Sequence, residues 1–224
     1  MSGRGYREIG EARGYAWNTG LVEDPGVNVQ TPLTPASKRG IRLSISGGCL
    51  RPLLPEDVHQ GHIAGLNDPE INKYLVSVRA RTQTYETVNE FVSTDFLSED
   101  AVLFGIWAKN HQKHCGTVRL HRINRAERTA SIGICIFEKE VWGRSIGADA
   151  IRAVSRWAFE YLGICAIEAG AYAENIGSWR AFLKAGYVVA EDIRDRYKLE
   201  GKSVVVRKLV AYSPATGSPS PHVK

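Results

Sequence analysis

The chain has 224 residues, of which 43% are apolar and 24% are charged, and its formal net charge is +5. This composition is typical of a folded domain with a sizeable core and excludes a chain that is disordered throughout. The small positive excess also excludes the strong charge that DNA wrapping or a membrane surface needs, so neither a nucleic acid nor a membrane is expected as a partner.

The two ends differ from the middle of the chain. Residues 1–40 are rich in Gly, Pro, Thr and charge without a sustained period, and residues 213–224 (SPATGSPSPHVK) are a low-complexity polar tail. We expect the first to be a flexible extension and the second to be disordered. The amino end lacks the apolar segment of a signal peptide, and no run is long enough to span a bilayer, so we expect a cytoplasmic location. Residues 41–212 are predicted to form one domain.

Strand and helix signals alternate through the first half of that domain. Two strands, 41–46 and 49–54, are joined by Gly47-Gly48, which suits a two-residue hairpin turn. The proline and two carboxylates at 55–57 suit the first turn of a helix that reaches residue 66. A second helix is predicted over 84–97, because its apolar residues lie on one side.

The second half continues the alternation. Strands at 102–108, 114–120 and 130–137 follow one another with short connections, which indicates an antiparallel meander. Apolar residues at helical spacing predict the strongest helix over 145–162. The remaining elements are a strand, a helix and two strands, at 165–172, 176–185, 187–192 and 203–210. A strand, helix, strand passage after a meander predicts an α/β domain with a mixed sheet.

The cysteines give no sign of a metal site. They lie in apolar or strand-like stretches, at Cys49, Cys115, Cys135 and Cys165. They form no CxxC pair, and no histidine lies nearby at zinc-ligand spacing. We interpret them as reduced thiols and expect no metal in the protein.

The segment EVWGRSIGADA (140–150) places two glycines around an arginine and a serine where the helix at 145–162 begins. A helix start offers unpaired N–H groups and a partial positive charge, which bind phosphate when no side chain blocks the approach. The segment lacks the Gly-Lys-Ser/Thr end of a P-loop and the GxGxxG of a dinucleotide fold. Taken alone, it indicates either a phosphate site or a helix start whose small residues pack against the sheet.

Two motifs in sequence order resemble the GNAT acyl-CoA N-acetyltransferases, in particular the branch of ribosomal-protein N-terminal and amino-sugar acetyltransferases. SIGICIFEKEVWGRSIGADAI (131–151) is similar to the strand, loop and phosphate-binding helix start of that branch. AENIGSWRAFLKAGY (173–187) is similar to its second motif, an Asn, a Ser three residues on and a Lys-x-Gly-aromatic end. The resemblance covers about residues 41–210. It implies a mixed, mostly antiparallel sheet that is splayed at the centre, helices on both faces, and acetyl-CoA as the cosubstrate.

The resemblance also implies which residues bind the cosubstrate. In the family, pantetheine lies between the fourth and fifth strands, which here implies the backbone near Cys135 and Phe137, and Asn175 would bond the pantetheine arm. The pyrophosphate would lie on the amides of Gly143, Arg144, Ser145, Ile146, Gly147 and Ala148. The segment departs from the family pattern at Trp142, in place of Gln or Arg, and at Ser145, in place of Gly. A serine hydroxyl can itself donate to phosphate.

Acetyl transfer to an amine needs a neutral nucleophile, a base for its proton, donors for the oxyanion and an acid for the departing thiolate. Many members of the family use a tyrosine on the last motif helix as that acid, but Phe182 stands at this position. Ser178 is our candidate donor to the sulfur, with an ordinary helix-start serine as the alternative. Glu168 and Tyr172 share one face of their strand. Glu168 is a candidate base or a surface salt bridge, and Tyr172 is a candidate acid or orienting group or a rim tyrosine.

The acceptor is less clearly marked. In the family, the segment NDPEINKYL (67–75) shapes the acceptor pocket, so Asp68 and Glu70 either attract a cationic amine or are ordinary turn charges. The arginine-rich RLHRINRAER (119–128) is either a solvated hairpin or an anion contact. His59 and His62 are expected to be exposed on the first helix.

The resemblance favours a small primary amine as the acceptor, in particular an amino sugar or a nucleotide-linked amino sugar. The alternatives are N-terminal acetylation of a protein, such as a ribosomal one, and a non-catalytic member that only binds acyl-CoA. The sequence leaves open whether the protein is a homodimer.

Overall fold

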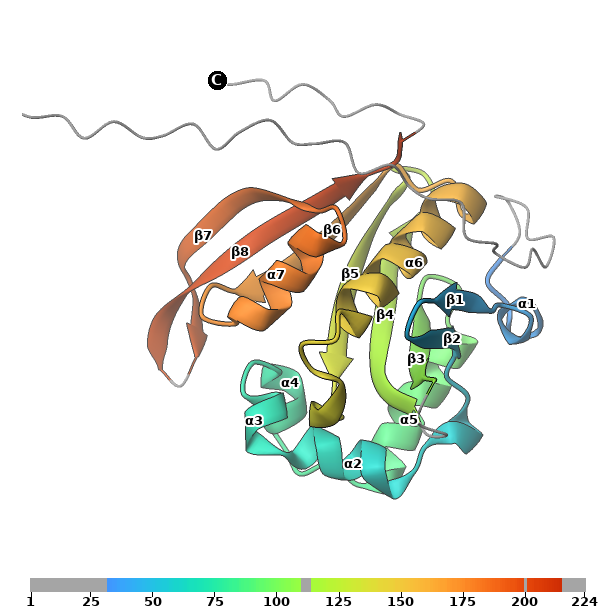
Figure 1. Cartoon of the computed structure of the whole chain (residues 1–224), viewed down its shortest axis with the longest axis horizontal. Coiled ribbons are helices and arrows are strands. Elements are labelled where there is room, and N and C mark those ends of the chain that lie inside the picture. Colours follow the sequence, from blue (N-terminus) through green and yellow to red (C-terminus); the bar gives the residue numbers. More distant parts are fainter. Residues whose placement is uncertain (1–31, 110–113, 200, 215–224) are drawn as a thin grey trace, which may run out of the picture.

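An eight-stranded sheet runs through the molecule in the order β1-β2-β3-β4-β5-β6-β8-β7 (Figure 1). The computed structural model describes residues 32–109, 114–199 and 201–214. The strands are β1 (Leu43–Ile45), β2 (Gly48–Pro52), β3 (Val102–Ala108), β4 (His114–Asn124), β5 (Thr129–Ile136), β6 (Ala166–Tyr172), β7 (Val188–Leu199) and β8 (Lys202–Tyr212). Neighbouring strands are antiparallel except for β5 and β6, which are parallel. The expected mixed, mostly antiparallel sheet is therefore confirmed.

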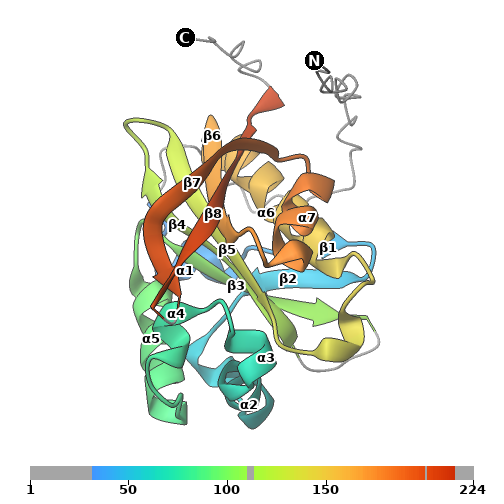
Figure 2. The same cartoon turned by 90° about the vertical axis from the view of Figure 1, so that its left-hand side faces the viewer.

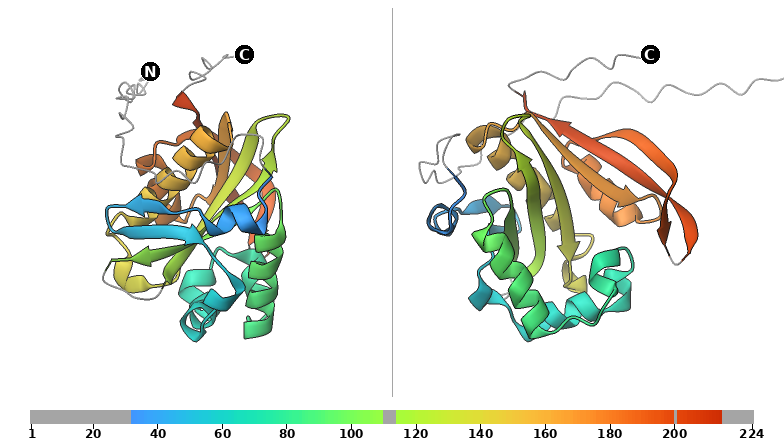
Figure 3. Two further views of the ribbon diagram at one scale, coloured as in Figure 1. Left: turned by 90° about the vertical axis from the view of Figure 1, so that its right-hand side faces the viewer. Right: turned by 180° about the vertical axis from the view of Figure 1, so that it is seen from behind.

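Helices cover both faces of this sheet. The α-helices are α1 (Pro35–Arg39), α2 (Gln60–Asn67), α3 (Pro69–Asn72), α4 (Val76–Arg79), α5 (Tyr85–Leu97), α6 (Ile146–Tyr161) and α7 (Ile176–Lys184). The short 3-10 helices are η1 (Pro55–Asp57) and η2 (Lys139–Val141). Figure 2 shows α6 and α7 on one side of the sheet and α5 on the other, and Figure 3 shows α5 from behind. None of the helices in the described ranges is both long and apolar enough to cross a membrane.

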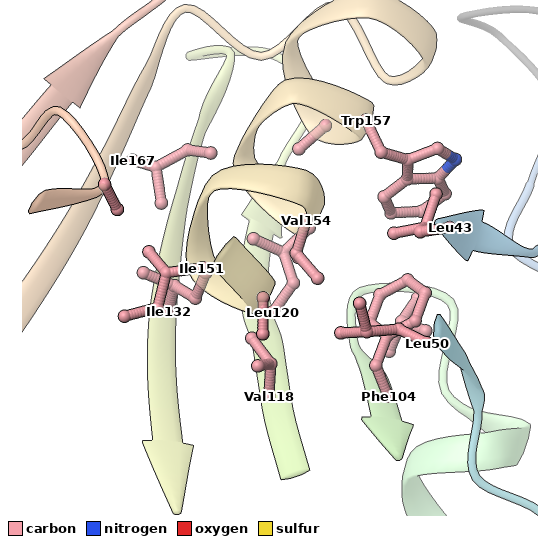
Figure 4. Close-up of a cluster of buried hydrophobic side chains, with 14 of the residues drawn as sticks. Leu43, Leu50, Phe104, Val118, Leu120, Ile132, Ile151, Val154, Trp157 and Ile167 are labelled. Carbon is pink, nitrogen blue, oxygen red and sulfur yellow. The ribbon is translucent and has the colours of Figure 1, made fainter. Parts of the chain in front are cut away.

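The main core lies between α6 and the sheet. Ile151, Val154 and Trp157 recur at helical spacing and are fully buried, which gives α6 one apolar face. They pack against strand residues such as Phe104 and Leu120 (Figure 4). Full burial of an aliphatic side chain of this size stabilises a fold by about 2 kcal/mol. This packing holds α6 against the sheet, so that its first turn lies beside the end of β5.

Several elements differ from the sequence prediction. The helix expected from residue 55 to 66 is two pieces, η1 and α2, because Val58 and His59 are extended (ψ 124° and 165°). The segment between α2 and α5 holds α3 and α4, which the sequence did not predict. Of the expected extension 1–40, residues 32–40 are described, and Leu33 there is fully buried in the core. The tail 213–224 lies outside the described residues beyond 214.

The sheet opens between β5 and β6. These strands pair over only three residues, Thr129 to Ser131 on β5 against Ala166 to Glu168 on β6. Further along, β5 pairs only with β4, and β6 pairs only with β8. The two strands diverge toward α3 and α4, which lie below the open end in Figure 1. The splay that the family resemblance implies is present.

Three histidines meet between α2 and β4. Nε2 of His59 lies 3.1 Å from Nδ1 of His114, and the ring centroids of His62 and His114 are 4.8 Å apart. His62 and His114 are buried, and neither Nδ1 of His62 nor Nε2 of His114 has a hydrogen-bond partner. The expected exposure of His62 is therefore wrong: its ring stacks on Phe137 at a centroid distance of 4.9 Å, so the helix turns it inward. No group of described side chains is arranged to hold a metal ion.

A partly buried ion pair ties α5 to β4. Arg119 donates two hydrogen bonds to the carboxylate of Asp95, at 2.6 and 2.7 Å, and that carboxylate is only 2% exposed. The ammonium of Lys38, from α1, donates to the backbone oxygens of Asp95, Phe96 and Ser98 at the end of the same helix. These contacts satisfy helix carbonyls that have no partner within α5.

Candidate active site

The open part of β5 directs backbone groups into the splay. The amide of Phe137 donates to the carbonyl of Cys115 on the neighbouring strand β4. The next pair of this ladder, Gly116 and Ile136, is therefore one whose backbone groups do not bond each other. In an antiparallel ladder the polar groups of alternate residues point to opposite sides. The backbone groups of Ile134 and Ile136 therefore point away from β4, toward the gap that β6 leaves.

In this register the residues whose backbone faces the gap are Ile134 and Ile136, each one position from the residues that the family resemblance implied, Cys135 and Phe137. Cys135 pairs with Thr117 and directs its backbone toward β4, and the amide of Phe137 already has a partner in Cys115. The sequence could not fix this, because a one-residue change of register reverses which backbone groups face a gap. Cys135 is half-buried, and the desolvation of its thiol raises the pKa to about 12.

The first turn of α6 has free amides beside this gap. No side chain caps the helix, and the first bond to its N-cap is the one from the amide of Asp149 to the carbonyl of Ser145. The amides of Ile146, Gly147 and Ala148 therefore lack helical acceptors. Free N–H groups at the positive end of a helix dipole form a ready anion site.

Two residues shape the approach to these amides. Gly143 has φ +75°, and a Cβ built on it meets nothing within 4 Å, so the loop is open on that side. Ser145 has φ +63°, a left-handed conformation that favours glycine, which is the residue of the family pattern at this position. The guanidinium-bearing Arg144 lines a cavity of about 240 Å³ together with Lys109, which places two cations near the helix start.

Gly147 faces the open part of β5. A Cβ on this residue would lie 3.4 Å from Cδ1 of Ile134 and 3.9 Å from Cγ1 of Ile136, which is ordinary van der Waals contact. The first turn of α6 therefore lies directly against this part of the strand, and its free amides are next to the splay.

Trp142 stands at the same edge. Its indole N–H donates to the carbonyl of Ile136 at 3.1 Å, and the residue is 42% exposed. This carbonyl is one of those that face the gap. Trp142 therefore lies at the open end of the splay, on the side of α6.

On the other side of the gap, α7 carries the second motif. The side-chain oxygen of Asn175 accepts from the amide of Ser178 at 3.3 Å and so caps the helix. Its Nδ2 group is left as a donor, and the Ser178 hydroxyl lies on the first turn, half-buried. Phe182 is buried in the core against Tyr187, with ring centroids 5.1 Å apart.

Glu168 and Tyr172 lie on the face of β6 opposite α7. The alternate residues Ile167, Ala169 and Ala171 belong to the core on the side of α6 and α7. Alternation along the strand therefore places Glu168 and Tyr172 on the α5 side of the sheet. Glu168 lies at the closed end of the splay, where Lys208 forms an ion pair with it at 2.9 Å. Tyr172 lies at the open end, and its ring centroid is 5.7 Å from that of Tyr74.

The segment with Asp68 and Glu70 spans the mouth of the splay. Both carboxylates bind the ammonium of Lys139, each at 2.7 Å, and Lys139 belongs to η2 directly after β5. Tyr74 holds the other end of the segment against β6 through Tyr172. The sequence singled out the two acidic residues and missed Lys139 and Tyr74. The signal for Lys139 was weak, because an ion pair across 69 positions leaves no spacing pattern.

The arginine-rich segment lies at the closed end, away from this mouth. Arg119 pairs with Asp95, Nε of Arg128 donates to the carbonyl of Gly163 at 2.7 Å, and Arg125 donates to the carbonyl of Glu99. These side chains hold the β4–β5 turn to its surroundings. The structure therefore gives this segment a structural use and does not bring it to the acceptor side.

A sheet that opens between parallel strands, with free backbone groups facing the gap and an uncapped helix start beside it, defines the class of acyl-CoA-dependent transferases. Residues 49–188, more than half of the chain, match the family model described as acetyltransferase (GNAT) domain. The chain belongs to the GNAT acetyltransferase family and is an acyltransferase.

Individual relatives agree with this assignment. The probable N-acetyltransferase YjcK of Bacillus subtilis (strain 168) is 37% identical over 99 residues, which are 44% of this chain and 54% of that protein, so the match spans about half of that relative. The ribosomal-protein alpha-N-acetyltransferase RimL, solved with coenzyme A, has a TM-score of 0.68 at 14% identity, over 76% of this chain and 97% of that one. Spermidine N-acetyltransferase from Vibrio cholerae, solved with CoA and spermine, has a TM-score of 0.64 at 18% identity, over 73% and 94%. At such identities the two solved structures establish the fold alone.

Proposed function

We propose that the enzyme transfers the acetyl group of acetyl-CoA to the primary amine of a small acceptor, and that an amino sugar or a nucleotide-linked amino sugar is the favoured acceptor. The observation that carries the proposal is the coincidence, at one point, of the open sheet and the uncapped start of α6. The backbone of Ile134 and the amide of Ile136 supply hydrogen bonds for an extended chain with amides, whereas the Ile136 carbonyl is bound by Trp142. The helix start supplies an anion site.

The cosubstrate fits these residues as follows. The pyrophosphate lies on the amides from Gly143 to Ala148, with Arg144 as a counter-charge, and the absence of a Cβ at Gly143 keeps the approach open. The pantetheine arm lies in the splay, with the Nδ2 group of Asn175 as a further donor from α7. The thioester then comes to the mouth, between the first turn of α7 and Tyr172.

The chemistry is an attack by the neutral amine nitrogen on the thioester carbonyl. The new C–N bond forms, the C–S bond breaks, the amine loses one proton, and the CoA thiolate gains one. We assign the hydrogen bond to the departing sulfur to Ser178, with a water molecule as the proton source behind it. Tyr172, at the open end, orients the acceptor. Glu168 is the candidate base, but it lies four residues away at the closed end and pairs with Lys208, so it would take the proton only through a chain of water molecules.

Ser178→Ala tests the assignment to sulfur. We expect kcat to fall about 100-fold, because a positioned proton donor contributes at least that much, while the KM for acetyl-CoA and the melting temperature stay unchanged. The matched change Ser155→Ala removes a hydroxyl from α6 that bonds Tyr187 in the core, and it should leave kcat unchanged after correction for folded protein. An unchanged kcat in Ser178→Ala would return this serine to an ordinary helix-start role.

The acceptor is tested by release of free CoA thiol. The purified protein is given acetyl-CoA with a panel of amines: glucosamine, a nucleotide-linked amino sugar, spermidine and short peptides with a free amino terminus. Fastest turnover on the amino sugars supports the proposal, and fastest turnover on the peptides replaces it with N-terminal acetylation. Binding of CoA in calorimetry without turnover on any amine would identify a member that binds acyl-CoA without catalysis.

A further inference from the structure

The ammonium of Lys139 is bound by two carboxylates beside the open end of the splay. Its Nζ atom lies 2.7 Å from Oδ2 of Asp68 and 2.7 Å from Oε2 of Glu70. Asp68 also caps α3, since its side chain accepts from the amide of Glu70 at 2.8 Å, so this carboxylate is fixed in orientation. The hydrogen bond to Lys139 lowers the pKa of Asp68, and that to Asp68 raises the pKa of Lys139. Both groups are therefore charged at neutral pH.

The ion-pair cluster of Asp68, Glu70 and Lys139 lies at the open end of the splay. Residues 68–74 run across the open end of the splay, tied to η2 by Lys139 and to β6 by the contact between Tyr74 and Tyr172. On the same segment Lys73 lies over the ring of Tyr74, 5.1 Å from its centroid, and no carboxylate pairs with it among the described residues. An acceptor that reaches the mouth from the α5 side must pass this segment.

From this arrangement we infer that Lys139 is a specificity-determining residue that excludes di- and polyamines from the acceptor site. The inference rests on the proposed function and narrows its acceptor class. Asp68 and Glu70 together offer two negative charges to a cation, but Lys139 neutralises them from within the chain. Lys73 adds only a weaker repulsion, because its charge is exposed and screened by solvent. An acceptor that carries one amine and no further cation, such as an amino sugar, meets no such penalty.

The test is the variant Lys139→Gln, which removes the ammonium and keeps a side chain of similar length on an exposed residue. We expect the ratio of kcat/KM for spermidine to kcat/KM for glucosamine to rise about tenfold, because two exposed carboxylates become available to the second ammonium of spermidine. The rise should be larger at low than at high NaCl, since exposed charges are screened by salt.

Two controls separate this effect from a change in net charge. Lys73→Gln removes one positive charge from the same segment without freeing a carboxylate, and it should change the ratio less than twofold. The triple variant Asp68→Asn, Glu70→Gln and Lys139→Gln should return the ratio to that of the unaltered protein. An unchanged ratio in Lys139→Gln, or an equal rise in either control, overturns the inference.

A binding measurement keeps this result distinct from failure of the proposed function. Equilibrium dialysis of radiolabelled spermidine against the full chain, with CoA present, should show tighter binding to Lys139→Gln than to the unaltered protein. If no amine is acetylated by any variant, the proposed function fails, and the dialysis alone decides the role of Lys139. Equal spermidine binding by both proteins would then refute it.

Discussion

Acidification from pH 7 to pH 5 is expected to destabilise the protein by about 4 kcal/mol through two buried histidines. Burial is the main cause that lowers the pKa of His62 from 6.5 to about 4 and that of His114 from 6.5 to about 3, and the neighbouring histidines lower both further. Each ring has a nitrogen without a hydrogen-bond partner and lies against Phe137, so neither site can solvate a charge.

The sign follows from proton binding in the two states. Below pH 6.5 an unfolded histidine takes up a proton, whereas His62 and His114 in the fold stay neutral until pH 4 or lower. The unfolded state therefore binds more protons, and the free energy of unfolding falls as the pH falls. At pH 5 the difference is about 1.5 pH units per group, or about 2 kcal/mol each at about 1.4 kcal/mol per unit.

Urea denaturation at pH 7 and pH 5, followed by circular dichroism, measures this loss. The window is chosen because the pKa values of Asp57, Asp68 and Asp192 are lowered from 3.8, so these carboxylates stay ionised at pH 5. The pKa of His121 is also lowered, chiefly by burial, so a smaller fall should persist in the double variant His62→Gln, His114→Gln. A fall of less than about 1 kcal/mol in the unaltered protein, or an equal fall in the double variant, would refute the reasoning.

Three further predictions concern single residues. Ser145→Gly should raise the free energy of unfolding by about 1 kcal/mol, because φ +63° is strained for serine and not for glycine. An unchanged free energy of unfolding in urea denaturation would mean that the left-handed conformation carries no strain. Gly65→Ala should lower the free energy of unfolding by about 2 kcal/mol and raise the KM for the acceptor, because the new methyl group would lie 2.5 Å from Cβ of Phe137 and push α2 away from β5. An unchanged melting temperature would contradict this. Arg119→Ala should cost about 2 kcal/mol, because it leaves the buried Asp95 carboxylate without its partner while solvent reaches the arginine side of the pair. Arg122→Ala, at an exposed residue of the same strand, should cost less than about 0.5 kcal/mol, and similar melting temperatures for the two variants would argue against a stabilising pair.

The elements with strong local patterns were predicted well from the sequence. The strand at 102–108 and the helices near 84–97 and 145–162 match β3, α5 and α6, because alternation and helical spacing of apolar residues are local signals. α3 and α4 were missed because each has four residues, too few to show a period. The break between η1 and α2 was missed because it depends on the extended conformation of His59, which caps α2 with its own ring nitrogen.

The candidate site shows the same division. The glycine-flanked helix start and the motif with Asn175 and Ser178 were recognised, since each is a short run of the sequence. The orientation of the β5 amides was not, because it depends on the pairing of Gly116 with Ile136 in another strand. The partner of Asp68 and Glu70 and the contact between Tyr74 and Tyr172 likewise arise only when distant segments fold together.

The position of Trp142 has a practical consequence for following ligand binding. Trp157 is fully buried, whereas Trp142 is the most exposed of the described tryptophans, and its indole touches the edge of the splay through the carbonyl of Ile136. A ligand that enters the gap therefore changes the surroundings of this ring, and the variant Trp142→Phe shows its share of the tryptophan emission. The protein thus carries its own optical probe at the entrance to the gap, and a titration with CoA can be read without a dye, a label or a coupled enzyme.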